Sequence, residues 1–436
     1  MEISLCWLRR DLRIEDNAAL FHSLKSGQPV LPLFIFDTDL INNLEYDDKR
    51  LIFLYDTVLK LKLKFESFSS TLLVRIGKPE VIFDELFKEF EVGSVYANVD
   101  YEPYSIKRDL KVETLCKRQK TRFLRFHDHV IYAPETILKA DNQPYHVFTP
   151  YSKNWLTKFK SETTINFPSE SRLENLLTHS PMEMPEPILL NLVWRKTIFP
   201  SSDIEDLVIK NYSQTRDFPS LDATTHMGIH LRFGTISVRK LAATALHLNP
   251  TFLNELIWRE FYQMILFFHS EVVTHSFRAS YDRIQWLNKP EDFEAWSLGQ
   301  TGYPLVDAGI RQLVETGFMH NRVRMVTASF LTKHLLIDWR LGEAFFARYL
   351  LDYELASNNG GWQWAAGCGC DAVPYFRVFS PQRQQQRFDS DNEYIRRWLP
   401  EYSSPESYIK PIIEHSFARE RAIGFHRKAQ ETNFRI

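Results

Sequence analysis

The chain has 436 residues, of which 44% are hydrophobic, 25% charged and 14% aromatic, and its formal net charge is −2 at pH 7. This length favours two domains over one, and the composition is that of a globular protein. A net charge near zero favours no class of partner, but it leaves nucleic acid open because a local positive patch is enough to bind it.

The cysteines and the N-terminal residues indicate the cellular compartment of the protein. The four cysteines (Cys6, Cys116, Cys368 and Cys370) are too few and too scattered for a disulfide framework. Arginines stand where a signal peptide would carry apolar residues, and no apolar run reaches the roughly 18 residues of a membrane span. We therefore expect a soluble, cytoplasmic protein without membrane contact.

The first 135 residues alternate between strand and helix patterns. The short apolar runs that indicate buried strands lie at 3–8, 30–36, 71–77 and 92–99. The amphipathic patterns that indicate helices lie at 16–27, 48–65 and 79–90. This alternation predicts an α/β domain with a doubly wound parallel sheet over 1–135. The first strand is not followed by GxGxxG, so the usual dinucleotide fingerprint is absent.

The rest of the chain reads differently. Residues 136–204 are predicted to link two domains, because 160–205 is rich in Pro, Ser and Thr and lacks clear periodicity. Helical patterns then dominate, at 237–248, 250–269, 305–317, 321–338 and 342–357. We predict a mostly α-helical second domain over 205–436.

Tryptophans crowd into this second domain, and core packing is their simplest explanation. Glu255 and Trp258, however, are three residues apart and share one helix face, where a carboxylate and an indole can serve a planar ligand. Cys368 and Cys370 could supply only half of a four-ligand metal site, so we expect no metal.

Several longer stretches resemble one known family. They are WLRRDLRIEDNAAL (7–20), PYHVFTPYSKNW (144–155), NELIWREFY (254–262), TGYPLVDAGIRQLVETGFMHNRVRM (301–325), DWRLGEAFF (338–346) and NNGGWQWAAGCGCDAVPYFRVFSP (358–381). In this order and across nearly the whole chain they resemble the photolyase/cryptochrome family. The resemblance implies an N-terminal α/β domain, a linker and a helical domain that binds FAD in a U-shaped conformation.

The resemblance also implies which residues bind FAD. Asn358 would face N5 of the flavin, and Arg324 with Asp352 would form the buried ion pair under its ring system. Gly360 and Gly361 would let the backbone pass close to the rings. The remaining cofactor contacts implied by the resemblance are Tyr212, Arg216, Thr224, Thr225, Met227, Gly228 and Glu354.

Three tryptophans match the family's chain for photoreduction of the flavin. Trp362 would lie next to the flavin, Trp339 in the middle and Trp286 at the surface. Core packing is the alternative role for all three, but their spacing along the sequence reproduces the family pattern.

For substrate, the resemblance implies a pyrimidine dimer flipped out of DNA into a pocket beside the flavin. Glu255 would hydrogen-bond the dimer, Trp258 and Trp364 would stack on it, and Met325 would line the pocket. The nearby substrate and phosphate contacts would come from Asn321, Arg322 and Arg377. Phe318 departs from the pattern, since many members that act on cyclobutane dimers have tryptophan there.

The function we predict is light-driven DNA repair by a deoxyribodipyrimidine photolyase, a carbon–carbon lyase. FAD, active as FADH⁻, would donate an electron to a cyclobutane pyrimidine dimer, with Glu255, Asn358 and Met325 as catalytic residues. The alternatives are a cryptochrome-type blue-light photoreceptor and a (6-4) or DASH-type photolyase. Met325 in place of a second histidine disfavours the (6-4) substrate, and a chain that ends at Ile436 lacks the tail usual in signalling cryptochromes.

A second, light-harvesting chromophore is the least determined part. Folate-binding members carry an Asn-Glu pair where this chain has Tyr104 and Ser105. A folate in that mode is therefore not expected, and a deazaflavin, a second flavin or no antenna stay open. DNA is the expected partner, and we expect a monomer.

Overall fold

A computed structural model describes residues 1–162, 166–404 and 407–431. Part of the predicted linker (163–165) and the end of the chain (432–436) lie outside the described residues. The chain divides into two compact units, each made of several segments. The first comprises residues 1–136, 156–204 and 226–247, and the second comprises 137–155, 205–225 and 248–436. The boundaries expected from sequence, at 135/136 and 204/205, stay a prediction.

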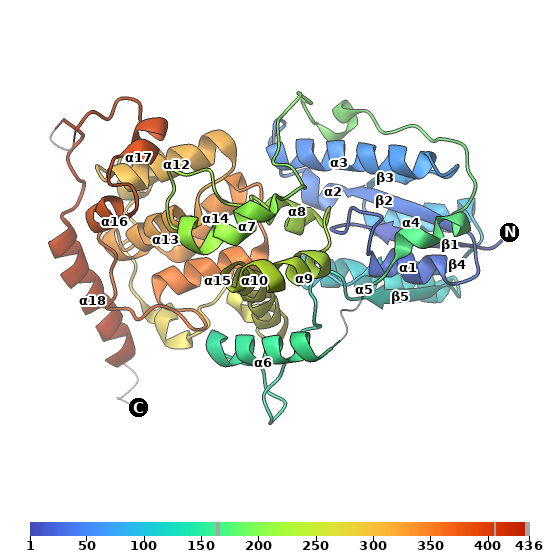
Figure 1. The fold of residues 1–436 in the computed structure, drawn as a ribbon, viewed down its shortest axis with the longest axis horizontal. Helices are drawn as coiled ribbons and strands as arrows, with labels where there is room; N and C mark the ends of the chain where they lie inside the picture. Colours follow the sequence, from blue (N-terminus) through green and yellow to red (C-terminus); the bar gives the residue numbers. More distant parts are fainter. Residues whose placement is uncertain (163–165, 405–406, 432–436) are drawn as a thin grey trace. The chain divides into compact units, whose positions relative to one another are not determined.

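The first unit is built on a parallel five-stranded sheet in the order β3-β2-β1-β4-β5 (Figure 1). Its strands are β1 (Ile3–Leu8), β2 (Val30–Asp37), β3 (Leu73–Gly77), β4 (Val92–Asn98) and β5 (Arg122–Phe126). Its helices are α1 (Ala18–Leu24), α2 (Thr38–Ile41), α3 (Lys49–Glu66), α4 (Pro79–Glu89), α5 (Pro103–Arg118), α8 (Gly228–Phe233) and α9 (Val238–Leu248). The predicted doubly wound α/β domain is confirmed.

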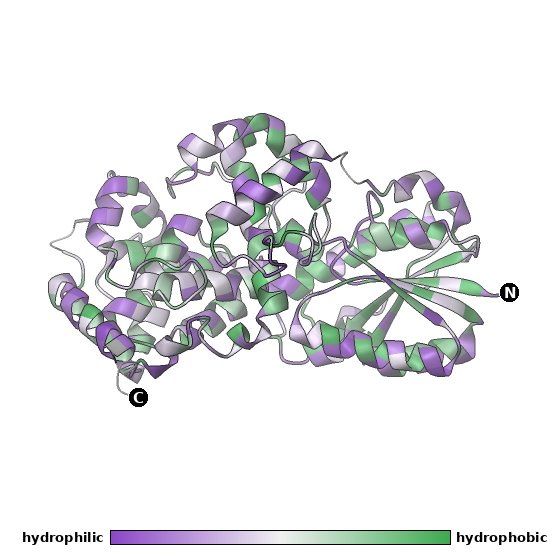
Figure 2. Ribbon diagram, turned by 90° about the horizontal axis from the view of Figure 1, so that it is seen from below, coloured by the Kyte–Doolittle hydropathy of each residue, from purple (hydrophilic) through white to green (hydrophobic). Residues whose placement is uncertain are grey.

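Alternation along the strands distributes their side chains to two faces of the sheet. In β1, Cys6 and Leu8 pack in one core with α1 and α3, whereas Leu5 and Trp7 pack in the other with α4 and α5. Both faces are therefore covered, and the strands inside the sheet are largely apolar, as is usual for parallel sheets. Figure 2 shows these strands largely in the hydrophobic colour, between helices whose outer sides are hydrophilic.

The longer elements of this unit that were not predicted include α5 and β5. The helix α5 carries many charged residues, and its buried side includes the ion pair of Arg108 and Asp109. The strand β5 (RFLRF) pairs only with β4, at the edge of the sheet, and none of its residues is fully buried. Ion pairs in α5 and edge pairing in β5 take the place of apolar contacts. Apolar periodicity is therefore weak in both elements, and the sequence did not indicate them.

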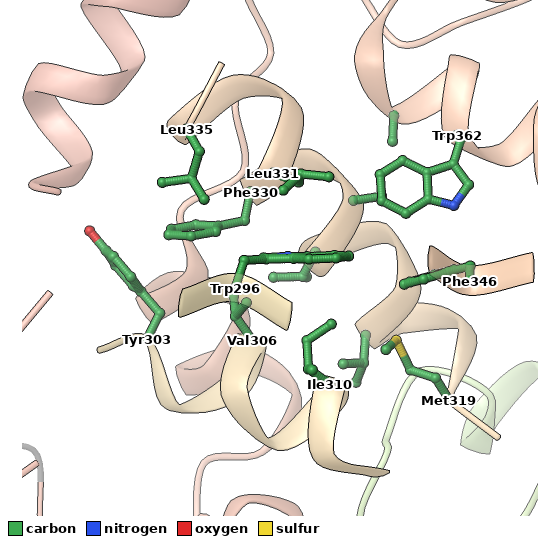
Figure 3. Packing of buried hydrophobic residues seen from close by; sticks show 14 of the residues in the cluster. Trp296, Tyr303, Val306, Ile310, Met319, Phe330, Leu331, Leu335, Phe346 and Trp362 are labelled. Carbon is green, nitrogen blue, oxygen red and sulfur yellow. The ribbon is translucent and has the colours of Figure 1, made fainter. Parts of the chain in front are cut away.

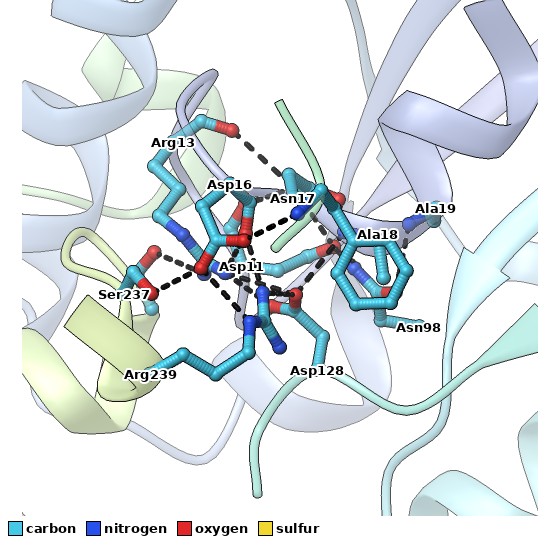
Figure 4. Close-up of polar contacts among 12 residues, drawn as sticks. Asp11, Arg13, Asp16, Asn17, Ala18, Ala19, Asn98, Asp128, Ser237 and Arg239 are labelled. Atoms are coloured by element: carbon cyan, nitrogen blue, oxygen red, sulfur yellow. Dashed lines mark hydrogen bonds and ion pairs between the residues drawn. The ribbon is translucent and has the colours of Figure 1, made fainter. Parts of the chain in front are cut away.

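A buried polar network lies at the carboxyl ends of β1, β4 and β5 (Figure 4). Asp128 accepts hydrogen bonds from Arg13 at 2.7 Å and from Arg239 at 2.8 Å. Burial alone would raise the pKa of Asp128, but the two guanidinium groups hold it well below its usual range. Arg239 also donates to Asp16, so the 226–247 segment is joined to the turn before α1 by charge pairs.

The second unit is helical. It contains α7 (Asp206–Thr215), α10 (Pro250–Phe268), α11 (Pro290–Ser297), α12 (Pro304–Thr316), α13 (Asn321–Ser329), α14 (Trp339–Tyr349), α15 (Leu355–Ala366), α16 (Pro381–Phe388), α17 (Glu393–Trp398) and α18 (His415–Glu431). The helix α6 (Phe148–Ser161) begins in this unit. Trp296, Tyr303, Phe330 and Trp362 lie in its largest apolar core (Figure 3). The predicted mostly helical domain is confirmed.

Two of the helices predicted from sequence are wrong in extent. The helix expected over 321–338 ends at Ser329, and a π-helical turn (Phe330–His334) and Leu336 at a positive φ of 54° follow. The helix expected over 342–357 is interrupted after Tyr349, where the N–H of Leu351 donates to the carbonyl of Gly317 at 2.9 Å. Apolar periodicity runs through both breaks because the side chains there remain buried in the core.

Candidate functional site

A cavity of about 440 Å³ opens in the second unit, within the size range of small-molecule sites. It is lined by Arg216, Glu255, Trp258, Arg259, Tyr262, Asn321, Arg324, Met325, Ala328, Phe346, Leu350, Asp352, Tyr353, Glu354, Ser357, Asn358, Gly361, Trp362 and Trp364. Twelve of these nineteen residues, Gly361 included, were predicted from the sequence to lie at the site. The cavity therefore brings together residues that the resemblance assigned to flavin and residues that it assigned to substrate.

Helical spacing explains why these residues converge. On α10, Glu255 is followed by Trp258, Arg259 and Tyr262 at intervals of three, four and seven residues, which share one face. The same intervals recur on α13, from Asn321 to Ala328. The break between α14 and α15 then carries Asp352 and Glu354 to the cavity, where a continuous helix would not have placed both.

Charged groups line the cavity as arginine–carboxylate pairs. The pairs are Arg216–Glu255 at 2.5 Å, Arg259–Glu354 at 2.7 Å and Arg324–Asp352 at 2.9 Å. Desolvation would lower the pKa of Arg216, but the adjacent carboxylate of Glu255 raises it, so this guanidinium stays charged. The Oδ1 atom of Asp352 is buried and has no hydrogen-bond partner among the described residues. A buried acceptor without a partner is costly, so it calls for a donor from a bound molecule.

The amide of Asn358 is oriented by a carboxyl behind the cavity. Its Nδ2 donates to the Oε1 of Glu343 at 2.8 Å and to the backbone carbonyl of Glu343 at 3.2 Å. With both amide hydrogens directed at α14, Asn358 presents its Oδ1 on the other side as an acceptor. Burial raises the pKa of Glu343, although its hydrogen bond with Asn358 opposes that effect.

Aromatic rings form much of the wall. Trp362 is buried, with its ring edge-on to Phe346 at 4.8 Å and to Trp296 at 6.1 Å. Its indole N–H has no partner among the described residues, and neither has that of Trp339. Flat apolar walls with a few polar groups suit a planar, polar-edged ligand.

Other predicted residues of the second unit do not line the cavity. Tyr212 lies on α7, and the guanidinium carbon of Arg216 is 5.1 Å from the centroid of its ring. Burial raises the pKa of Tyr212 to about 12. Arg322 pairs with Asp217 at 2.6 Å. The remaining residues away from the cavity in this unit are Thr224, Thr225, Trp286, Trp339 and Arg377. Phe318 also lies off the cavity, where its ring is 5.9 Å from the guanidinium of Arg324.

Two predicted cofactor residues belong to the first unit. Met227 and Gly228 fall in the 226–247 segment, where Gly228 begins α8. Their contact with a cofactor stays a prediction.

Sequence reasoning missed part of the lining. Arg259 and Tyr262 follow Glu255 by four and seven residues, so extending the predicted face of α10 by one turn would have found them. Leu350, Tyr353 and Ser357 could not be found in this way, because a single helix was expected where α14 and α15 are separate.

Metal ligands and membrane spans are further features that the structure addresses. All four cysteines are free and buried, and burial raises the pKa of both Cys368 and Cys370 to about 12. Within the described ranges, no group of three or more His, Cys, Asp or Glu side chains is arranged to hold a metal ion. Across the same residues, every helix is too short or too polar to cross a membrane.

Comparison with known families matches both halves of the chain. Residues 4–170 match the model described as DNA photolyase, and residues 252–429 match the FAD binding domain of DNA photolyase. The deoxyribodipyrimidine photo-lyase of Alkalihalophilus pseudofirmus is 35% identical, with 98% of each chain covered.

Solved structures show the same likeness. An archaeal photolyase from Sulfolobus tokodaii, described with two FAD molecules, has a TM-score of 0.82 at 29% identity and covers 98% of this chain and 100% of its own. A cryptochrome from Synechocystis has a TM-score of 0.85, covers 98% of this chain and 99% of its own, and is 24% identical. At that identity the second likeness concerns the fold alone.

Proposed function

The chain belongs to the DNA photolyase family, and from that premise we propose that it repairs DNA by splitting cyclobutane pyrimidine dimers. One observation carries the proposal: a single cavity holds Asn358 and Asp352 of the expected flavin site together with Glu255 and Trp258 of the expected dimer site. When bound and reduced, FAD would supply the chemistry, because on absorbing blue or near-UV light it can donate an electron to the dimer and recover it after the ring has split.

The cavity suits the isoalloxazine of FAD. The unpartnered Oδ1 of Asp352 and the oriented Oδ1 of Asn358 are both acceptors, and the edge of a flavin offers N–H donors. Gly361 lines the cavity, and a Cβ built on it would meet nothing within 4 Å, so the backbone is open to a flat ring there. Arg324 pairs with Asp352 and donates its Nε–H to the carbonyl of Met319 at 2.7 Å. These two contacts would hold the positive charge of Arg324 beneath the ring.

On the substrate side, Glu255 would accept hydrogen bonds from the flipped bases while Trp258 and Trp364 stack on them and Met325 closes the apolar wall. Glu255 is paired with Arg216, which orients the carboxylate as an acceptor. Tyr262 and Arg259, one turn further along α10, extend the same wall.

Contacts with DNA would come from residues around the opening of the cavity. Asn321 is exposed at the start of α13, and the next residue, Arg322, is partly exposed. Arg322 and Arg377 would bind phosphates flanking the dimer, so the affinity for DNA should fall steeply as salt is raised.

Electrons that reduce oxidised FAD would come through Trp362, Trp339 and Trp286. Trp362 lines the cavity and Trp339 is buried at the start of α14, while Trp286 is only partly buried. Indoles suit stepwise transfer, because their rings delocalise the radical. On α14, three residues after Trp339, Gly342 has no side chain and so leaves room for the ring of Trp362.

The decisive experiment compares reduced wild-type protein with Glu255→Ala and Asn358→Ala under blue light, with a thymine-dimer oligonucleotide as substrate. Glu255→Ala should retain FAD but bind and repair the dimer poorly. Asn358→Ala should instead be impaired in holding reduced flavin. A Glu255→Ala variant with unchanged repair would remove the proposed dimer contact. Light-driven flavin reduction without repair by the wild type would favour the cryptochrome alternative, and repair of a (6-4) photoproduct instead would favour that subfamily.

For light harvesting, we propose that a second chromophore in the first unit is a flavin or deazaflavin rather than a folate. Tyr104 and Ser105, which replace the Asn-Glu pair, are held by Asp37 at 2.7 Å and by Asp100 at 3.0 Å. The proposal is supported by the Sulfolobus relative, for which two FAD molecules are described. Chromatography of the chromophores released on denaturation checks it, and a released pterin would contradict it.

A further inference from the structure

We propose that Phe148 is a positioning residue for Trp258: it covers one face of the indole, so that only the opposite side can stack on a dimer. The inference deepens the proposed function and rests on it. It also gives a role to the 144–155 stretch, which resembles the family but supplies no residue to the cavity.

The two rings are stacked in parallel. Their centroids are 3.6 Å apart and their planes differ by 6°. Aromatic pairs in proteins usually have centroids 4.5–7 Å apart, so this ring lies directly over the indole. Phe148 is buried whereas Trp258 is half-buried and lines the cavity. One face of Trp258 is therefore taken up by Phe148.

Phe148 is itself held in place. Its backbone N–H donates to Asp371 at 3.0 Å, and its ring lies edge-on to Phe261 at 5.7 Å. Seven residues further on, the buried Trp155 donates its indole N–H to Glu260 at 2.7 Å. The start of α6 is thus fixed to α10 just beyond Trp258, and it forms a rigid support behind the indole.

Such a support matters for recognition. A stacking side chain that is free to turn loses that freedom when a ligand binds, and the loss weakens binding. If Phe148 is removed, Trp258 can tilt into the space behind it. Affinity for a flipped dimer should then fall, whereas affinity for undamaged DNA, which depends on phosphate contacts, should stay the same.

The test measures binding in the dark by the FAD-loaded protein, with dimer-containing and undamaged oligonucleotides. Phe148→Leu should weaken dimer binding about two- to tenfold, the range of an aromatic pair, and leave undamaged DNA unaffected. Phe268→Leu makes the same exchange near the end of α10, away from the cavity, and should change neither affinity. In a Trp258→Leu background, Phe148→Leu should have no further effect on dimer binding.

Several results would overturn the proposal: equal losses on both DNAs, an undiminished loss in the Trp258→Leu background, or unchanged dimer binding. Fluorine NMR of fluorotryptophan-labelled protein tests the positioning independently of repair, with the Trp258 resonance assigned by its loss in Trp258→Phe. Phe148→Leu should shift or broaden that resonance, and an unaltered one would refute the stack as a constraint. If the wild type itself does not prefer dimer DNA, the proposed function fails while the NMR result still decides the role of Phe148.

Discussion

Gly360 and Gly361 are neighbours on α15, and replacing each by alanine should have opposite consequences. A Cβ on Gly360 would lie 2.3 Å from the ring of Tyr262, whereas one on Gly361 would enter open space in the cavity. Alanine is favoured over glycine inside a helix by about 1 kcal/mol at either position. Crowding against Tyr262 costs about 1–3 kcal/mol.

The helix-propensity gain cancels when the two variants are compared. Flavin-free Gly361→Ala should therefore be more stable to urea than Gly360→Ala by about 1–3 kcal/mol, the cost of crowding alone. Flavin binding should show the reverse order, because the methyl group of Gly361→Ala occupies space where the ring would approach the backbone. Urea unfolding followed by circular dichroism and titration with FAD measure the two effects. Equal stability of the variants would refute the packing, and wild-type FAD affinity in Gly361→Ala would refute the proposed approach of the flavin.

Three further predictions concern separate parts of the molecule. Trp362→Phe should block photoreduction of oxidised FAD, measured by absorption, while chemically reduced protein still repairs dimers; normal photoreduction would contradict the electron path. Glu343→Leu removes an acceptor of the Asn358 amide and should weaken retention of reduced FAD in a gel-filtration assay, whereas Glu343→Gln keeps an acceptor oxygen and should behave like wild type. Asp128→Asn removes a buried carboxylate that pairs with both Arg13 and Arg239, of which Arg239 also pairs with Asp16, and should cost about 3–5 kcal/mol in urea unfolding at neutral pH. Because the folded-state pKa of Asp128 is depressed, its contribution is present above the unfolded value of about 4 and is lost as the pH falls through the folded value. The difference in the free energy of unfolding between wild type and variant should therefore shrink at acid pH. A difference independent of pH would contradict the charge pairing.

The sequence predicted the architecture well because hydrophobic periodicity and family motifs agree on it. The parallel sheet follows from apolar runs such as 30–36, whose side chains are buried on both faces. The strand β5 was not predicted because it lies at the edge of the sheet, where arginines replace apolar residues. The helix α5 was not predicted because Arg108 and Asp109 form an ion pair in its buried face. A search for hydrophobic periodicity does not detect an ion pair.

The site was predictable where residues share a helix face and not where the chain leaves a helix. Glu255 and Trp258 were placed together by their spacing alone. Asp352 reaches the cavity only because α14 ends at Tyr349, and a hydrogen bond to a distant carbonyl decides that end. Phe148 behind Trp258 is a contact between segments about a hundred residues apart, so no local pattern could have indicated it.

The most direct test of the central claim is to recover intact thymines from a thymine-dimer oligonucleotide incubated with FAD-loaded, reduced protein under blue light and in darkness. The account predicts recovery in light only, with many turnovers per protein and no net consumption of reductant. No recovery in light, by protein whose FAD is bound and reduced, would contradict it.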